Sequence, residues 1–428
     1  VLPIGWKSQK DYFWFAFFLV LLDQPGGLFS GGERTDMQRL PIYNLTGKIS
    51  FTIAELYFLL LFAKVIKYKD RYSTKLMMSE FRFLIILFII LVLISIPIGF
   101  STVSIRNVYK TLIVFTTFYT FVKIFNTREE LNKFFNLIFP FAFIAFALQI
   151  FSLISRQQLV GLFKAGVTVT QGVFAVSEKM GIDRPIELVH ILFICFTASL
   201  YLLNERNRIF TKTYLIYIAL FSYISIILTA TRSWFLAFSF GLFYFFLYSI
   251  RHNRKVFALA SIFGIIGFIT LLSDNMVSKQ FQDATSRLFT VAALVKGDFT
   301  AEGTLQRFDI RGPKVMKAFS ESTIILGSGF SDHYWENADG HVGYQNLLFN
   351  TGIIGAFIFL LITIKMLLKV YSKRLPYDNN KLAILPLILL LIINTGTQTI
   401  GFTIGAERMI LNAFAVVLIY NEKELIYS

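Results

Sequence analysis

The chain has 428 residues, of which 55% are hydrophobic and 17% are aromatic, and its formal net charge is +15. A soluble core does not need so much apolar surface, and repeated continuous apolar runs of about 18 or more residues exclude a closed β-barrel, whose strands alternate. Positive charge of this kind is typical of the cytoplasmic loops of a membrane protein, so nucleic acid is not an expected partner.

We predict an all-α polytopic membrane protein with about twelve transmembrane helices. In chain order the predicted spans are 11–22, 49–66, 81–99, 106–125, 132–154, 186–203, 210–229, 232–250, 255–273, 344–368, 381–397 and 404–420. The first span is short and is followed by a Pro-Gly-Gly sequence at 25–27. The fourth carries Arg106 and Lys110 and is the least apolar of the twelve.

The distribution of lysine and arginine predicts how the chain is oriented. These cations are more numerous in one alternate set of connections, which the positive-inside rule places in the cytoplasm together with both termini. Spans one to nine then occupy 1–273 and the last three occupy 344–428, within one integrated membrane domain. The long connection 274–343 lies on the outer face, and its apolar stretches Leu288–Val295 and Ile324–Leu326 predict short helices on the membrane surface.

Several arginines stand close to the predicted membrane boundary on the outer face. Arg106, Arg232 and Arg408 each adjoin a span, and Arg307 and Arg311 lie in the long loop. Arginine at this depth is costly unless it is paired or lines a watery cavity, and its planar fork suits phosphate or carboxylate. For any one arginine, pairing with a nearby acid or a lipid head group is an equally good explanation. As a set, they predict an outward-facing anion site.

A histidine stands where the span after the long loop begins. In the stretch GHVGYQNLLFNTGIIGAF, His341 precedes the apolar run, and Gly352 and Gly355 lie inside it. A neutral imidazole suits a general base, and the glycines are expected to let a neighbouring helix approach closely. The alternative for His341 is a structural histidine that hydrogen-bonds carbonyl groups of the loop.

Acidic side chains accompany the histidines on the outer face. The sequence SDHYWENADGH, which ends at His341, has the residue types of a metal site, but such groups are common in polar loops. We therefore expect no metal and no cofactor, and we expect Glu336 or Asp339 to orient His341. Glu187 and His190 lie one helical turn apart at the outer end of the sixth span, where they would line an acceptor path or form a satisfied polar pair.

The order of these features resembles a known family. An arginine in a tight outer turn (Arg232), an arginine before a Gly-x-Gly sequence in a long outer loop (Arg307 or Arg311) and a histidine opening the next span (His341) are similar to the O-antigen polymerases and O-antigen ligases. These membrane enzymes handle lipid-linked oligosaccharides. The resemblance extends over about 220–360 in local sequence and over the rest of the chain in topology alone.

The histidine motif separates the two kinds of enzyme. His341, Gly352 and Gly355 match the spacing of the ligase pattern, in which Asn, Ser or Gln follows the histidine. Val342 occupies that second position here and departs from the pattern. Polymerases share a looser form, so the motif favours a polymerase.

The resemblance implies a multi-span glycosyltransferase of the C-type superfamily in the bacterial inner membrane, with its site facing the periplasm. Its donor would be an undecaprenyl-diphosphate-linked oligosaccharide. Its acceptor glycolipid would be another lipid-linked repeat for a polymerase, or lipid A–core for a ligase. A chain-length regulator and a repeat-unit flippase would be further partners, besides membrane lipid.

The expected chemistry assigns roles to the outer residues. Arg232, Arg307 and Arg311 would stabilise the charge that develops on the leaving diphosphate, and His341 would accept the proton of the attacking hydroxyl. The residues expected to bind substrate are Arg408, Arg106, Glu336, Asp339, Glu187 and His190.

A transporter or flippase for an anionic lipid-linked glycan is the alternative from another functional class. Twelve spans and a set of arginines suit such a protein. A transporter, however, places its charged groups near the bilayer midplane and is built from related halves. The arginines here lie at the outer boundary and the sequence has no visible internal repeat, which favours the enzyme.

Overall fold

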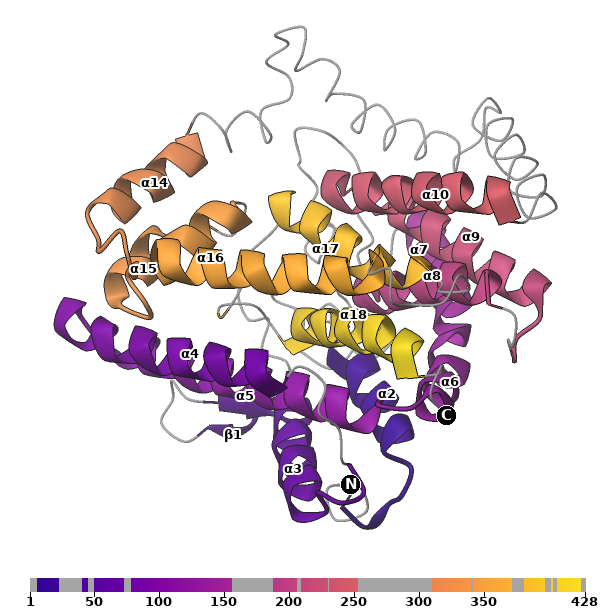
Figure 1. The fold of residues 1–428 in the computed structure, drawn as a ribbon, viewed down its shortest axis with the longest axis horizontal. Coiled ribbons are helices and arrows are strands. Elements are labelled where there is room, and N and C mark those ends of the chain that lie inside the picture. Colours follow the sequence, from indigo (N-terminus) through magenta and orange to yellow (C-terminus); the bar gives the residue numbers. More distant parts are fainter. Residues whose placement is uncertain are drawn as a thin grey trace, which may run out of the picture. The chain divides into compact units, whose positions relative to one another are not determined.

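The computed structural model describes residues 6–22, 41–44, 50–72, 78–155, 188–205, 209–229, 231–252, 310–339, 342–371, 381–396, 402 and 406–424 (Figure 1). These residues are almost all helical, which confirms the predicted helical class. Within them, three helical stretches are long and apolar enough to cross a membrane, and they cover Ser79–Ile98, Arg128–Phe151 and Gly343–Tyr371. This is the composition of a membrane protein.

The described elements form two compact units, which we take in turn. The elements of the first unit are β1 (Pro41–Asn44), β2 (Ser50–Thr52), α3 (Ile53–Lys67), α4 (Met78–Ile98), α5 (Thr102–Ile124), α14 (Gly312–Ser320), α15 (Asp332–Asn337), α16 (Gly343–Tyr371), the short 3₁₀ helix η5 (Lys381–Ile384), α17 (Leu385–Gly396) and α18 (Ala406–Glu424). β1 and β2 pair in an antiparallel hairpin, in which Tyr43 lies opposite Phe51. This hairpin was not predicted.

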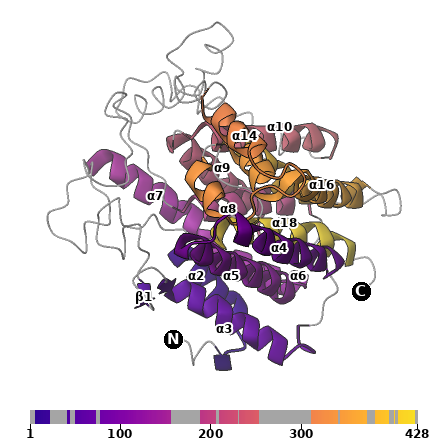
Figure 2. The ribbon, with the colours of Figure 1, turned by 90° about the vertical axis from the view of Figure 1, so that its left-hand side faces the viewer.

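The first unit is a helical bundle around α5. α4 and α5 lie side by side in both ribbon views (Figure 2), and α3 and α18 also pack on α5. Aromatic side chains fill the interface, and the ring of Phe115 lies 5.6 Å from that of Phe88 and 5.4 Å from that of Phe402. α14 and α15 lie at the N-terminal end of α16, and both are described parts of the predicted outer loop.

Ion pairs in the first unit join helix ends that the sequence analysis places on the same side of the membrane. Glu55 at the start of α3 pairs with Lys110 in α5, both on the predicted outer side. Glu80 at the start of α4 pairs with Lys365 near the end of α16, both on the predicted inner side. An alternating topology requires this grouping, while the assignment of the two sides to cytoplasm and periplasm stays a prediction.

The second unit contains the remaining described helices. These are α2 (Asp11–Leu22), α6 (Arg128–Ile138), α7 (Pro140–Ser155), α8 (Val189–Leu203), α9 (Lys212–Leu228) and α10 (Arg232–His252). α8 is buried along most of its length and packs on α9. The predicted span 132–154 is divided into α6 and α7 at Pro140, because proline lacks the N–H that a continuous helix would use there.

The direction of two helices in this unit follows from their ring contacts. Phe139, just before α7, contacts Phe210 just before α9, and Phe146, two turns later in α7, contacts Phe221 within α9. The residue numbers rise together along the interface, so α7 and α9 run in the same direction. Two odd-numbered spans of one chain are expected to do so. The predicted ninth span, 255–273, and the loop up to 309 lie outside the described residues.

Candidate functional site: a broken helix and an apolar cavity

α16 is interrupted at Gly352, whose backbone angles are φ 62° and ψ −170°. A break of this kind leaves N–H and C=O groups without partners inside the helix. The preceding loop supplies them through four hydrogen bonds: Ile353 N to Ile324 O (3.1 Å), Ile354 N to Ile325 O (3.2 Å), Ser328 N to Phe349 O (2.8 Å) and Gly329 N to Asn350 O (2.9 Å). Non-helical backbone at membrane depth is tolerated only where other protein groups satisfy it in this way.

Gly352 and Gly355 of α16 do not have the predicted helix-packing role. Both were expected to admit a neighbouring helix. Gly352 instead admits the loop, because a Cβ atom there would overlap the backbone of Ile325 and Gly327. Gly355 faces Thr351, one turn earlier in its own helix. The prediction of a close backbone approach is therefore correct for Gly352, and the predicted partner is wrong.

The loop segment continues from the break into the helical bundle. Gly329 has a φ of 58° and lies against the carbonyl group of Leu91 in α4. The N–H of Phe330 donates to Ser95 Oγ at 2.6 Å, and the buried Phe330 ring lies 5.4 Å from that of Phe88. The segment is thus wedged between α4 and α16, and it is not one of the predicted short surface helices.

α15 is attached to the N-terminus of α5 through Asp332. Asp332 Oδ1 accepts hydrogen bonds from Ser101 Oγ (2.6 Å) and Ser104 Oγ (2.9 Å), and the N–H of Asp332 donates to Gly99 O (3.0 Å). The bond from Ser101 is the main reason why the pKa of Asp332 lies below its ordinary value, and Ser104 adds to it. The carboxylate also lies where the dipole of α5 favours negative charge.

We expect Asp332→Asn to lower the melting temperature of the purified protein at pH 7. A carboxyl group whose pKa is lower in the folded state stabilises the fold above its unfolded pKa, and this contribution is lost as the pH falls through the folded pKa. The difference from the parent should therefore disappear in acid. Glu336→Gln is the matched control, because Glu336 is exposed on the same short helix. Equal melting temperatures for the parent and Asp332→Asn at pH 7 would contradict this role.

Two of the predicted site residues meet in the loop. Arg311, at the start of α14, approaches Asp339 with 3.5 Å between a guanidinium nitrogen and Oδ1, and both side chains are half-buried. Asn346 of α16 fixes the backbone of Asp339, since its Oδ1 accepts from Asp339 N at 3.2 Å and its amide donates to Asp339 O. The N–H of Val342 also donates to Asp339 O, at 3.2 Å. Asn346 is the residue that the sequence analysis missed.

The histidine of α15 is held by structural contacts. His333 Nε2 lies 3.1 Å from the carbonyl oxygen of Ala318, and its ring meets that of Phe349 edge-on. Asp332, the other potential ligand beside it, is bonded to the serines of α5. Within the described parts of the chain, no group of three or more His, Cys, Asp or Glu side chains could hold a metal ion.

The other predicted site residues are distributed over both units. In the first unit Arg106 and Glu336 are exposed, and Arg408 is half-buried. In the second unit His190 is half-buried with its ring 5.6 Å from that of Trp234. α9 ends at Leu228 and α10 begins at Arg232, which confirms the tight turn. Outside the described residues lie Glu187, Arg307 and His341, together with the side chain of Arg232.

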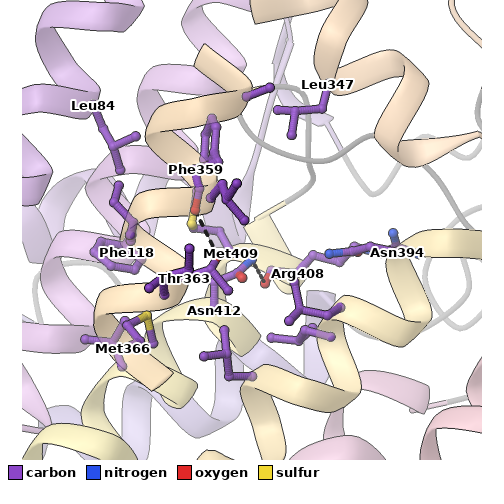
Figure 3. A pocket seen from close by; sticks show the side chains of 18 of the residues that line it. Leu84, Phe118, Leu347, Phe359, Thr363, Met366, Asn394, Arg408, Met409 and Asn412 are labelled. Carbon is purple, nitrogen blue, oxygen red and sulfur yellow. Dashed lines mark hydrogen bonds between the residues drawn. The ribbon is translucent and has the colours of Figure 1, made fainter. Parts of the chain in front are cut away.

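A cavity of about 580 Å³ lies within the first unit, between α4, α5, α16, α17 and α18 (Figure 3). Its walls are almost entirely apolar, with Leu84 and Phe118 on one side of the view and Arg408 and Asn394 on the other. Among the described residues that line it, Arg408 is the one charged side chain. The sequence analysis predicted Arg408 as a substrate-binding residue, but not the cavity.

Both halves of the broken helix contribute to the cavity. Tyr344 and Leu347 come from the half before Gly352, and Phe359 and Met366 come from the half after it. Tyr344 is held by a hydrogen bond from its hydroxyl to Leu391 O of α17, at 2.8 Å. The volume is within the usual range for small-molecule sites, which are mostly apolar with a few polar groups. This cavity suits a long apolar chain that carries an anionic group at one end.

Comparison with known protein families and with curated proteins finds no match to the chain.

Proposed function

We propose that this protein is a polymerase of O-antigen or another surface polysaccharide. It transfers a glycan from an undecaprenyl-diphosphate donor to the sugar of a lipid-linked acceptor, on the outer face of the bacterial inner membrane. The observation that carries the proposal is the apolar cavity. Among the described residues that line it, Arg408 is the one with a charged side chain. Isoprenoid units fit the apolar walls, and a diphosphate pairs with the planar guanidinium group.

The outer loop supports the same function. Arg311 brings a second guanidinium group to the N-terminal end of α16, where Asp339 and Asn346 hold its surroundings in place. In this proposal the chain has about twelve spans with both termini in the cytoplasm, and the loop lies in the periplasm. The donor diphosphate then meets the acceptor sugar at the outer boundary of the membrane.

The proposed reaction is a direct transfer. The acceptor hydroxyl oxygen attacks the anomeric carbon of the donor, and the bond from that carbon to the diphosphate oxygen breaks. His341 accepts the proton of the hydroxyl group, and Arg232, Arg307 and Arg311 stabilise the charge that develops on the leaving diphosphate. These roles follow from the family resemblance and from the chemistry that a glycosyl diphosphate requires.

Two other functions remain candidates. A ligase would transfer the same glycan to lipid A–core, and the spacing of His341, Gly352 and Gly355 matches the ligase pattern, from which Val342 departs. A transporter or flippase is favoured by the break in α16, because discontinuous helices are common in transporters. In this protein, however, the break is filled by loop backbone, which is hydrogen-bonded to both halves of the helix.

A deletion strain distinguishes the three functions. Surface glycan is extracted and separated on a gel, and lipid-linked intermediates are measured on each side of the inner membrane. A single capped repeat supports the polymerase. Loss of all glycan from the core, with long chains still attached to lipid, indicates the ligase. Accumulation of lipid-linked repeats on the cytoplasmic side indicates the flippase.

We expect Arg408→Gln to weaken binding of undecaprenyl diphosphate by about 10-fold to 100-fold, because a hydrogen bond to a charged group contributes roughly 1.5–3 kcal/mol. The affinity of Arg408→Lys should lie between those of the parent and Arg408→Gln, since the ammonium group keeps the charge but cannot donate two parallel hydrogen bonds. Binding of the radiolabelled lipid to protein in nanodiscs measures the effect. Lys317→Gln, on the exposed face of α14, removes an equivalent charge and should bind as the parent does. Unchanged binding in both Arg408 variants would remove the cavity from the donor site.

A further inference from the structure

A tight turn projects from the loop beside the break in α16. A bridge between Thr323 and Gly327 closes this turn, and its corner carries Ile324 and Ile325. The side chains of these two isoleucines are 50% and 60% exposed. Turns are normally built from Gly, Pro, Asn, Asp and Ser, so two exposed β-branched apolar residues at a turn corner indicate that something other than water faces them.

The exposed isoleucines continue the apolar surface of α16. Hydrogen bonds attach Ile324 and Ile325 to Ile353 and Ile354, which are themselves 55% and 43% exposed. Beyond them the exposed apolar side chains of the helix are Phe357, Leu360, Leu361, Ile364 and Leu368. α16 is one of the helices long and apolar enough to cross a membrane, so lipid is the expected neighbour of this surface.

The length of α16 places the turn at the depth of the outer leaflet. From Lys369, in the last turn of the helix, back to Ile353 the helix rises about 24 Å at 1.5 Å per residue. The hydrocarbon core of a bilayer is about 30 Å thick. If Lys369 lies at the inner boundary, Ile353 is still within the hydrocarbon, and the turn that is bonded to it lies at the same level.

The residues that precede the turn are polar. Ser320 and Glu321 are exposed at the end of α14, as is Lys317 one turn earlier. The segment therefore presents charged groups on its approach and an apolar corner at its tip. This is the pattern of an element that lies in the interface with its apolar side in the acyl chains.

We propose that the turn 323–327 inserts Ile324 and Ile325 into the outer leaflet, and that this contact with lipid acyl chains anchors the described loop segment 310–339 to the bilayer surface. The partner is the bilayer itself. The backbone bonds to Ile353 and Ile354 make the turn and α16 one continuous lipid-facing surface. The inference depends on α16 crossing the membrane and not on the reaction, so it stands or falls independently of the glycosyltransferase.

Spin labelling tests whether the turn lies in lipid. In a Cys195→Ala background, single cysteines at Ile325, Phe357 and Glu321 are labelled with a nitroxide, and the full-length protein is reconstituted in liposomes. Phe357 on the exposed side of α16 is the lipid reference, and the exposed Glu321 is the water reference. Collision rates with oxygen, which concentrates in lipid, and with a water-soluble nickel chelate report the environment. We expect the label at 325 to resemble that at 357, with oxygen collisions dominant.

Two results at position 325 would overturn the proposal. A label at 325 that collides mainly with the nickel chelate, as at 321, would show that the turn faces water. A label at 325 that is immobile and shielded from both reagents would show that protein covers the turn. The labelled positions are exposed, so the label is tolerated, and size-exclusion chromatography of each labelled protein confirms its fold. A label at 357 that reports water would instead reject the crossing of α16.

Discussion

Replacement of Gly352 by alanine is expected to abolish the accumulation of folded protein. Gly352 has a φ of 62°, in the left-handed region that costs an L-residue roughly 1–2 kcal/mol. A Cβ atom would also overlap the backbone of Ile325 and Gly327, and this backbone is fixed by the hydrogen bonds across the break. The loop and the helix cannot move apart without losing those hydrogen bonds in apolar surroundings. The free-energy cost of the substitution therefore far exceeds the backbone cost of the left-handed conformation.

Fluorescence-detected size-exclusion chromatography of a fusion to a fluorescent protein measures this effect as the height of the monodisperse peak. Gly99→Ala is the matched control. Gly99 also has a positive φ, of 134°, but the nearest atom to a Cβ at this position would be 3.7 Å away, in the side chain of Asp332. We expect this variant to keep a reduced but clear peak. Equal peaks for the two variants would mean that the break tolerates a side chain.

The second large effect is expected at His341. If His341 is the general base, His341→Ala should transfer glycan about 10²–10⁴-fold more slowly than the parent, which is the usual contribution of general base catalysis. Binding of the lipid-linked donor should change little. Activity of the parent should rise with pH as the imidazolium ring loses its proton, because only the neutral ring accepts a proton. Transfer in proteoliposomes, with donor and acceptor both saturating, gives the turnover.

Controls separate catalysis from loop structure. His252 is the last residue of α10 and lies on the predicted cytoplasmic side. His252→Ala should therefore keep full turnover. If Glu336 or Asp339 is the base instead, His341→Gln will keep substantial activity and the pH profile will shift to lower pH. Near-normal turnover of His341→Ala would assign the histidine to closing the loop onto the helix.

Hydropathy located most helices because an apolar run of sufficient length has few alternatives to a helix. α4, α8, α9, α10 and α16 all fall where the sequence analysis placed spans. Local irregularities were less visible. Pro140 divides a predicted span into α6 and α7. In the hairpin, β1 lies in a predicted connection, and β2 occupies the first residues of the predicted span 49–66. In both places short-range geometry overrides the average hydrophobicity on which the prediction depends.

The sequence analysis predicted several residues of the candidate site but not their arrangement in space. Arg311 and Arg408 were expected as members of the outer set of arginines, and Asp339 as a residue that orients His341. The structure places Arg311 in contact with Asp339, and Arg408 in the wall of a cavity. The cavity itself depends on helices from two distant parts of the sequence, α4 and α5 on the one hand and α16, α17 and α18 on the other, so no local pattern could indicate it. The role of Asn346 likewise depends on two hydrogen bonds that join it to the backbone of Asp339 across the start of α16.

The completion of α16 by the loop has a consequence for how the protein is made. Residues 324–329 leave the ribosome before Gly352 does, so the backbone groups that complete the break are already synthesised when the helix enters the membrane. The helix can then insert with its break capped, provided that the loop has crossed first. The same dependence limits recombination between homologous genes. A crossover between 330 and 352 would pair a loop with a foreign helix, so the segment from 310 to 355 is expected to be inherited as a block.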